Sequence, residues 1–191
     1  MKHAVRDELR GVLVFVGTVW AVFLADFVIP GDLNRFGILP RTVSGLPGVV
    51  AMPFLHAGWG HLLSNTIPLI VLLCLLAGSR ANSAAVVIGI VLLGGALLWL
   101  FGRGDRVHVG ASGLIYGLIA FLLVAGFRER RFVPLAVAVI VGFLYGGTLL
   151  AGVLPTVGPG ISWDGHLLGA VAGAVVATAT VRPQRHEFVR A

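Results

Sequence analysis

The stretch Val109–Gly117, VGASGLIYG, sets one hydroxyl between glycines where a polar loop changes into a long apolar run. Glycines let the backbone approach another group closely, and a helix that begins at Ser112 puts its unpaired N–H groups and positive dipole end beside that hydroxyl. Such a place can hold an oxyanion. Glycine and serine are also common packing positions between membrane helices, so this stretch alone leaves both interpretations open.

The composition indicates a membrane protein. Of the 191 residues, 58% are hydrophobic and 12% are charged, and the mean hydropathy is +0.99, which is too apolar for a soluble domain. The 14 Lys and Arg exceed the 8 Asp and Glu, but they fall at the ends of apolar runs, which favours membrane topology over nucleic-acid binding. The single cysteine, Cys74, excludes an internal disulfide and disfavours a cysteine metal cluster.

Six apolar runs of about 16 to 21 residues can each cross a bilayer, which needs about 20 residues. We predict an all-α polytopic bundle of six transmembrane helices, in one domain over residues 1–191. The predicted spans are roughly 11–29, 61–78, 84–101, 112–127, 132–150 and 164–181.

Two connections between the predicted spans stand out. The segment 30–60 contains four prolines among apolar and polar residues and predicts a structured loop, partly in the membrane interface. The residues expected to dip into that interface are Phe36, Leu39, Leu46, Phe54 and Trp59. The segment 151–163 is rich in Gly and Pro and predicts a mobile flap.

The distribution of Lys and Arg predicts the orientation. If both termini lie on one side, that side collects ten of the 14 basic residues and the other side has four. The positive-inside rule then puts both termini in the cytoplasm. The predicted location of the protein is the cell (inner) membrane. The second, fourth and sixth spans therefore all run inward from the non-cytoplasmic face.

Candidate polar groups gather at the starts of those three spans. His61 and Asn65 begin the second span, Ser112 the fourth and His166 the sixth, so they share one depth in the membrane. Three positive helix ends converge there, which suits developing negative charge. His61 and Asn65 are four residues apart, on one helix face, and can donate hydrogen bonds toward an oxyanion.

Rows of small residues indicate which spans meet, because such rows let two helix backbones approach closely. If the rows of the fourth and sixth spans meet, Ser112 and His166 come within reach of each other, as a serine nucleophile and its histidine base require. Tyr116, one turn after Ser112, is placed to orient the imidazole. The rows are Gly113 and Gly117 in the fourth span and Gly165, Gly169 and Gly173 in the sixth.

Together these residues resemble the signatures of the rhomboid family of intramembrane serine proteases, over nearly the whole chain. The resemblance implies a six-helix rhomboid fold and a Ser112/His166 dyad. It also implies an oxyanion site made by the Ser112 backbone N–H with the side chains of His61 and Asn65. The matching motifs are His56-x4-His61-x3-Asn65, Gly110-x-Ser112-Gly113 with Tyr116, and Gly165-His166 with Gly169 and Gly173.

The reaction that the resemblance implies is hydrolysis of a peptide bond in or near a transmembrane segment, through an acyl-enzyme and without metal, nucleotide or other cofactor. The implied partners are transmembrane protein substrates and the lipid bilayer, with no nucleic acid. The first loop departs from several bacterial members, which carry a Trp-Arg pair where this chain has GILPR at residues 37–41. The chain resembles the minimal bacterial form, with no seventh span.

Each candidate also has a structural interpretation. His166 is a buried polar residue that caps a helix in that interpretation, although an ionisable group inside a membrane is costly and usually functional. His61 and Asn65 then only form hydrogen bonds between helices. His56 either takes part in catalysis or only holds the loop in place.

Four further residues are expected to have no catalytic role. Asp164 lies two positions before His166 and so points to another helix face, which favours N-capping at the interface over a catalytic triad. His108 lies in a charged loop, and His3 and His186 lie in the terminal segments, so we expect these three to be solvated.

Two other classes of function compete with proteolysis. A non-catalytic rhomboid-like protein that binds membrane clients is expected to lack the serine or the histidine, and both are present. A metalloprotease or small transporter using His56, His61 and His166 is the second class. The chain has no His-Glu-x-x-His motif, and a transporter is expected to show broken helices in paired halves.

Overall fold

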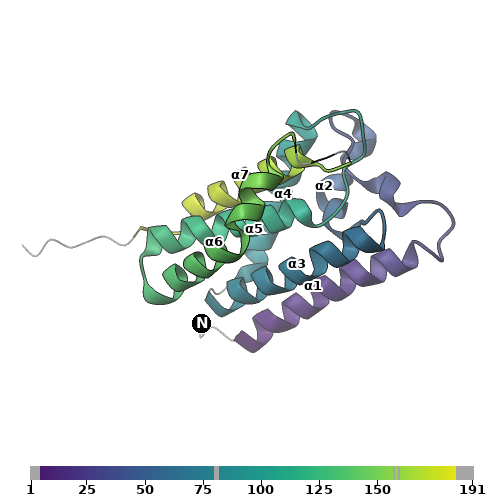
Figure 1. The fold of residues 1–191 in the computed structure, drawn as a ribbon. Helices are drawn as coiled ribbons and strands as arrows, with labels where there is room; N and C mark the ends of the chain where they lie inside the picture. Colours follow the sequence, from purple (N-terminus) through teal and green to yellow (C-terminus); the bar gives the residue numbers. More distant parts are fainter. Residues whose placement is uncertain (1–4, 80–81, 157, 159, 184–191) are drawn as a thin grey trace, which may run out of the picture.

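The computed structural model describes residues 5–79, 82–156, 158 and 160–183, so His3 and His186 lie outside the described residues. Within these residues all the regular elements are helices, joined by turns and loops, and the one β-contact is an isolated antiparallel bridge between Ile38 and His108 (Figure 1). The elements in chain order are α1 (Val5–Ala25), η1 (Leu33–Phe36), η2 (Val43–Gly45), α2 (Gly48–Ala51), η3 (Met52–Phe54), α3 (Trp59–Ser79), α4 (Ser83–Phe101), α5 (Ser112–Glu129), α6 (Phe132–Gly152) and α7 (Trp163–Thr180).

The long helices make the chain a polytopic helical membrane protein. Five of them, α1, α3, α4, α5 and α6, are long and apolar enough to cross a membrane by length and composition. The sixth apolar run lies in α7, whose 18 residues include many glycines and alanines in place of large apolar side chains. That composition suits a helix that packs closely on another helix.

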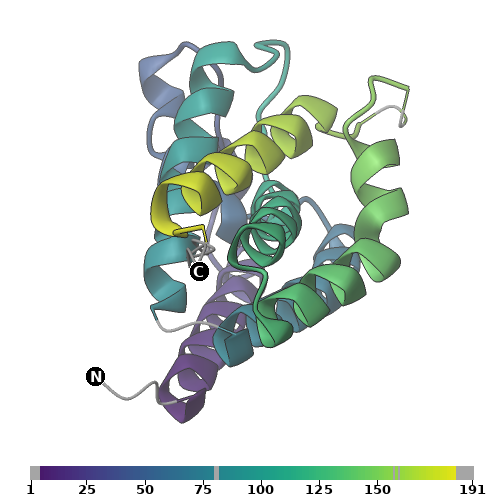
Figure 2. The same ribbon diagram turned by 90° about the vertical axis from the view of Figure 1, so that its left-hand side faces the viewer.

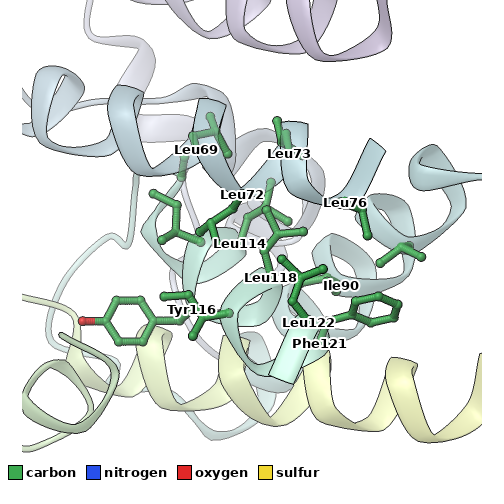
Figure 3. Close-up of a cluster of buried hydrophobic side chains, with 14 of the residues drawn as sticks. Leu69, Leu72, Leu73, Leu76, Ile90, Leu114, Tyr116, Leu118, Phe121 and Leu122 are labelled. Atoms are coloured by element: carbon green, nitrogen blue, oxygen red, sulfur yellow. The ribbon is translucent and has the colours of Figure 1, made fainter. Parts of the chain in front are cut away.

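Helix α5 is the centre of the bundle. In an 18-residue window, 67% of α5 is buried, whereas the value for α1 and for α6 is 17%. Figure 2 shows the other helices arranged around it. Leu114, Leu118 and Phe121 of α5 pack with Leu72 and Leu76 of α3 in one cluster (Figure 3). Because lipid tails are as apolar as leucine, close packing of these side chains, more than escape from water, favours this arrangement.

Glycines make the contact between α5 and α7. A Cβ atom added at Gly169 would collide with the carbonyl group of Gly113, and one added at Gly173 would collide with that of Gly117. The predicted contact between the two rows of small residues is therefore present. It holds together the first two turns of α5 and the second and third turns of α7.

The first helix differs from the prediction. It begins at Val5 and ends at Ala25, whereas the sequence indicated a span over 11–29. The Asp26 carboxylate accepts a hydrogen bond of 2.7 Å from the Leu33 N–H, so the residues after Ala25 already belong to the turn into the first loop. On the same side of the bundle as this turn, α6 continues to Gly152. The connection to α7 therefore begins two residues later than predicted, and its mobility stays a prediction.

The first loop is structured and contains η1, η2, α2 and η3. Two of the residues expected to dip into the membrane interface, Phe54 and Trp59, contact α1; the interfacial position of this group stays a prediction. The Phe54 ring lies 5.1 Å from that of Phe15, and the Trp59 ring lies 4.9 Å from that of Phe23. These contacts attach the loop and the start of α3 to the first helix.

Candidate active site

Ser112 is the first residue of α5, directly after the buried Ala111. Its side chain is partly exposed, and its hydroxyl has no hydrogen-bond partner among the described residues. The first N–H groups of a helix also lack partners within the helix. The structure thus presents an unpaired hydroxyl at the positive end of the central helix.

His166 lies in the first turn of α7, and its imidazole is held on two sides. Its Nδ1 atom is 2.9 Å from the Gly152 carbonyl oxygen, and its ring stacks on the Tyr116 ring at 4.2 Å between centroids and 5° between planes. Because a carbonyl oxygen only accepts, Nδ1 carries the proton, and the lone pair of the neutral ring is on Nε2. The Tyr116 hydroxyl donates to the Thr148 carbonyl oxygen at 3.0 Å, which fixes the tyrosine as well.

Ser112 and His166 start the two helices that meet at glycines. Gly113, the neighbour of Ser112, contacts Gly169 of α7. Tyr116 lies one turn after Ser112, and its ring stacks on the imidazole of His166. The two side chains are therefore on adjacent first turns, although no hydrogen bond between them is among the described contacts. Catalytic hydrogen bonds are often long in a free enzyme and shorten when substrate binds.

His56 and Asn65 form a buried pair beneath the loop that precedes Ser112. Asn65 Nδ2 is 3.2 Å from His56 Nε2, and the Ala111 N–H points at the same nitrogen from 3.5 Å. Two donors on one ring nitrogen require it to be unprotonated. Burial, and next the repulsion from His61, lower the pKa of His56 to about 4, so the ring is neutral at pH 7.

Gly110 brings the loop close to His61. Its φ of +113° is in a region that favours glycine, and an added Cβ would lie 2.5 Å from Cε1 and Nε2 of the His61 ring. The Gly110 N–H donates to the Met52 carbonyl oxygen at 2.9 Å, which anchors the loop. The rings of His61 and His56 are 5.0 Å apart. The structure thus gathers His56, His61 and Asn65 at the loop that leads into Ser112.

His108 is buried, and the expectation that it is solvated was wrong. Its side chain is 1% exposed, with Nδ1 2.6 Å from the Ser162 hydroxyl and Nε2 2.9 Å from the Arg103 carbonyl oxygen. The loop between α4 and α5 packs on the first loop, where the backbones of His108 and Ile38 exchange two hydrogen bonds. This burial removes the ring from solvent.

Asp164 is a buried partner of Arg103, and the expected N-cap role at the interface was wrong. Ser162 occupies the N-cap position of α7, and Asp164 is 5% exposed. Its carboxylate accepts the Arg103 N–H at 2.8 Å and the guanidinium at 3.1 Å. Sequence reasoning missed this pair, although both residues lie on the same predicted side of the membrane.

Ser162, His108 and Asp164 have the composition of a catalytic triad but not its accessibility. The His108 ring is enclosed, and its Nε2 lies beside the Arg103 carbonyl oxygen, 3.9 Å from Asp164. The group instead ties the first turn of α7, and hence His166, to the loop between α4 and α5. Among the described residues, no cluster of three or more His, Cys, Asp or Glu side chains is placed to hold a metal ion.

Comparison with known proteins identifies a family and several relatives. The family model named Rhomboid domain matches residues 44–183. An uncharacterized protein of Mycobacterium tuberculosis (strain ATCC 25618 / H37Rv) is 46% identical over 184 residues, which cover 91% of this chain and 75% of the relative. An uncharacterized protein of Mycobacterium leprae (strain TN) is 40% identical over 182 residues, which cover 91% of this chain and 72% of the relative. No solved structure matches.

Proposed function

Because the chain belongs to the rhomboid family, we propose that it is an intramembrane serine protease that cleaves other membrane proteins in or near their transmembrane segments. In this proposal the bundle has six spans, with α7 as the sixth. Both termini are cytoplasmic, and the site opens to the opposite side. The observation that carries the proposal is the stacking of His166 on Tyr116, one turn from the unpaired hydroxyl of Ser112.

The proposed reaction begins with proton transfer from Ser112 to His166. Nδ1 of His166 donates to the Gly152 carbonyl oxygen, so Nε2 is the free base. As Nε2 takes the proton, the Ser112 oxygen attacks the substrate carbonyl carbon and the carbonyl oxygen becomes an oxyanion. The stacked tyrosine keeps the ring in one plane, which reduces the entropy lost when the reacting atoms align.

The oxyanion is stabilised by the Ser112 backbone N–H and the side chains of His61 and Asn65. Asn65 already donates one amide hydrogen to His56, which fixes the plane of the amide and leaves its second hydrogen for the oxyanion. The C–N bond then breaks as His166 gives its proton to the leaving amine. Water, activated by His166, hydrolyses the ester on Ser112 and restores the free hydroxyl.

A protease at membrane depth requires access for both water and substrate. The position of Ser112 at a helix start is compatible with a water-filled opening on the non-cytoplasmic side. Substrate then approaches sideways past α6, which packs on the bundle with only 17% of an 18-residue window buried, and beneath the connection that follows Gly152. A cross-link between α6 and α3 is expected to block this route.

The proposal is tested by cleavage of a transmembrane substrate in liposomes. Ser112→Ala and His166→Ala are each expected to abolish cleavage while the protein still folds. Ser44→Ala, at an exposed serine in the first loop, is the matched control and should cleave normally. A fluorophosphonate probe should label the wild-type protein and not Ser112→Ala.

Two outcomes would contradict the proposal. Normal cleavage by either dyad variant would remove that residue from the reaction. A folded wild-type protein that binds transmembrane clients, but neither cleaves them nor reacts with the probe, would favour the non-catalytic binder.

A further inference from the structure

A cavity lies away from the candidate active site. It has a volume of about 550 Å³ and lies between α1, α3 and α4, beneath the first loop. Most of its wall is apolar. The apolar residues that line it include Val12 and Phe15 from α1, Phe54 from the first loop, Leu73 from α3, and Ile88 and Leu92 from α4.

The position of this cavity limits what can occupy it. Its three long helices are all candidate membrane spans, and α1 lies at the edge of the bundle (Figure 1), so its surroundings are lipid chains. The volume falls within the range of about 300–1,000 Å³ for small-molecule sites. It is too small for much of a helix, whose diameter with side chains is about 10–12 Å. An acyl chain is the apolar molecule that a bilayer supplies.

One end of the cavity is polar. Asp7, Glu8 and Ser83 line it there, at the end that the Lys and Arg distribution predicts to be cytoplasmic. Ser83 is 7% exposed, and its hydroxyl has no hydrogen-bond partner among the described residues. A buried hydroxyl without a partner destabilises the folded protein, and a ligand with an acceptor atom would satisfy it.

The charged residues that line this polar end are both acidic, and each already has a partner. The Glu8 carboxylate accepts the backbone N–H groups of Asn82 and Ser83 at 2.9 and 3.1 Å, which holds it at the start of α4. Asp7 forms an exposed ion pair with Arg10 at 3.3 Å. Two carboxylates thus line the cavity, and the exposed guanidinium of Arg10 lies outside it, beside Asp7. This pattern complements a headgroup that carries both a cation and a phosphate.

We propose that the cavity binds one zwitterionic phospholipid with an ethanolamine headgroup. Its acyl chain lies among the apolar residues, and an ester carbonyl oxygen accepts a hydrogen bond from Ser83. The ammonium group lies beside Asp7 and Glu8, and the phosphate lies toward Arg10. A phosphatidylglycerol has no ammonium group to offset the two carboxylates, so it should bind more weakly. This inference does not depend on proteolytic activity.

Two glycines of α1 offer a matched test. An added Cβ meets nothing within 4 Å at either Gly11 or Gly17, so both positions accept a side chain without a clash in the protein. Only Gly11 lines the cavity. Gly11→Leu should fill the cavity, whereas Gly17→Leu should add the same side chain outside it. Ala84→Leu blocks the cavity from α4 in case the first variant folds poorly.

The experiment is native mass spectrometry of protein equilibrated with equal amounts of phosphatidylethanolamine and phosphatidylglycerol. Wild-type protein and Gly17→Leu should each retain one lipid, with phosphatidylethanolamine favoured at least threefold. Gly11→Leu or Ala84→Leu should lose most of this retention, and Asp7→Asn should weaken the preference. Thermal unfolding confirms that each variant is folded.

Three results would overturn the proposal. Equal retention by Gly11→Leu and wild type would show that lipid does not bind in the cavity. Equal retention of the two lipids by wild type would remove the headgroup assignment. A lipid-free dimer that Gly11→Leu disrupts would assign the cavity to a second copy of the chain.

Discussion

Replacement of Gly169 by alanine tests whether the glycine contact between α5 and α7 sets the geometry of the site. The added Cβ would collide with the carbonyl oxygen of Gly113 and lie 2.8 Å from its carbonyl carbon, whereas ordinary van der Waals contact begins at 3.4 Å. Both partners are helix backbone, so no side chain can rotate away. The helices must separate by about 0.6 Å or more, next to Ser112 and one turn from His166.

The expected cost has two parts. Extra atoms in a well-packed interface typically cost about 1–3 kcal/mol. A displacement approaching 1 Å between reacting groups can lower the rate by about 100-fold. We therefore expect cleavage of the transmembrane substrate to fall by about one to two orders of magnitude, with a lower melting temperature. Both are measured on protein in detergent and in liposomes.

Gly94→Ala is the matched control, because it adds the same methyl group to another helix that contacts α7. Its Cβ would lie 3.5 Å from the Ala172 Cβ and 3.6 Å from the Gly169 Cα, which are ordinary contacts. This variant should keep wild-type activity and stability. If Gly169→Ala also cleaves within twofold of wild type and melts at the same temperature, the close contact does not set the site geometry.

Three further predictions follow from the surroundings of the dyad. Asp164→Asn removes the ion pair with Arg103 that fixes the first turn of α7, so kcat should fall about tenfold with KM changed less than twofold; an unchanged kcat would contradict this. Gly110→Ala forces a strained φ and displaces the His61 ring, so cleavage should fall about 100-fold, while the fluorophosphonate assay reports whether Ser112 still reacts. The pKa of His56 is lower in the folded protein, at about 4, than the usual 6.5 or so when unfolded. Its contribution to stability is therefore complete above pH 6.5 and is lost as pH falls toward 4, by up to roughly 3 kcal/mol. Unfolding measured from pH 7.5 to 4 should show a shallower pH dependence in His56→Gln than in wild type.

Much of the fold was predictable because its signals are local or periodic. Apolar length located the helices, and the spacing of Gly113, Gly117, Gly169 and Gly173 predicted which two pack most closely. Helix ends were harder to predict. Helix α1 ends at Ala25, before the apolar run does, and the Asp26 carboxylate accepts a hydrogen bond from the N–H of Leu33, seven residues later; hydropathy does not report such a bond.

Part of the candidate site was also predictable from the sequence, and part was not. Residues in the sequence motifs, such as His61 and Ser112, could be named because each stands at a helix start on one predicted side of the membrane. The surroundings of His108 and Asp164 could not be predicted. They depend on how the loop after α4 folds onto the first loop and α7, which is a contact between segments about 60 residues apart in sequence.

The end of α6 has two attachments to the site. The Gly152 carbonyl oxygen holds the proton of His166, and the Thr148 carbonyl oxygen holds the hydroxyl of Tyr116, the ring on which the imidazole stacks. A sideways shift of α6 would therefore loosen the base and its support together. If α6 moves aside to admit a substrate, His166 would lose the contact that orients it as a base. The return of α6 would re-form that contact.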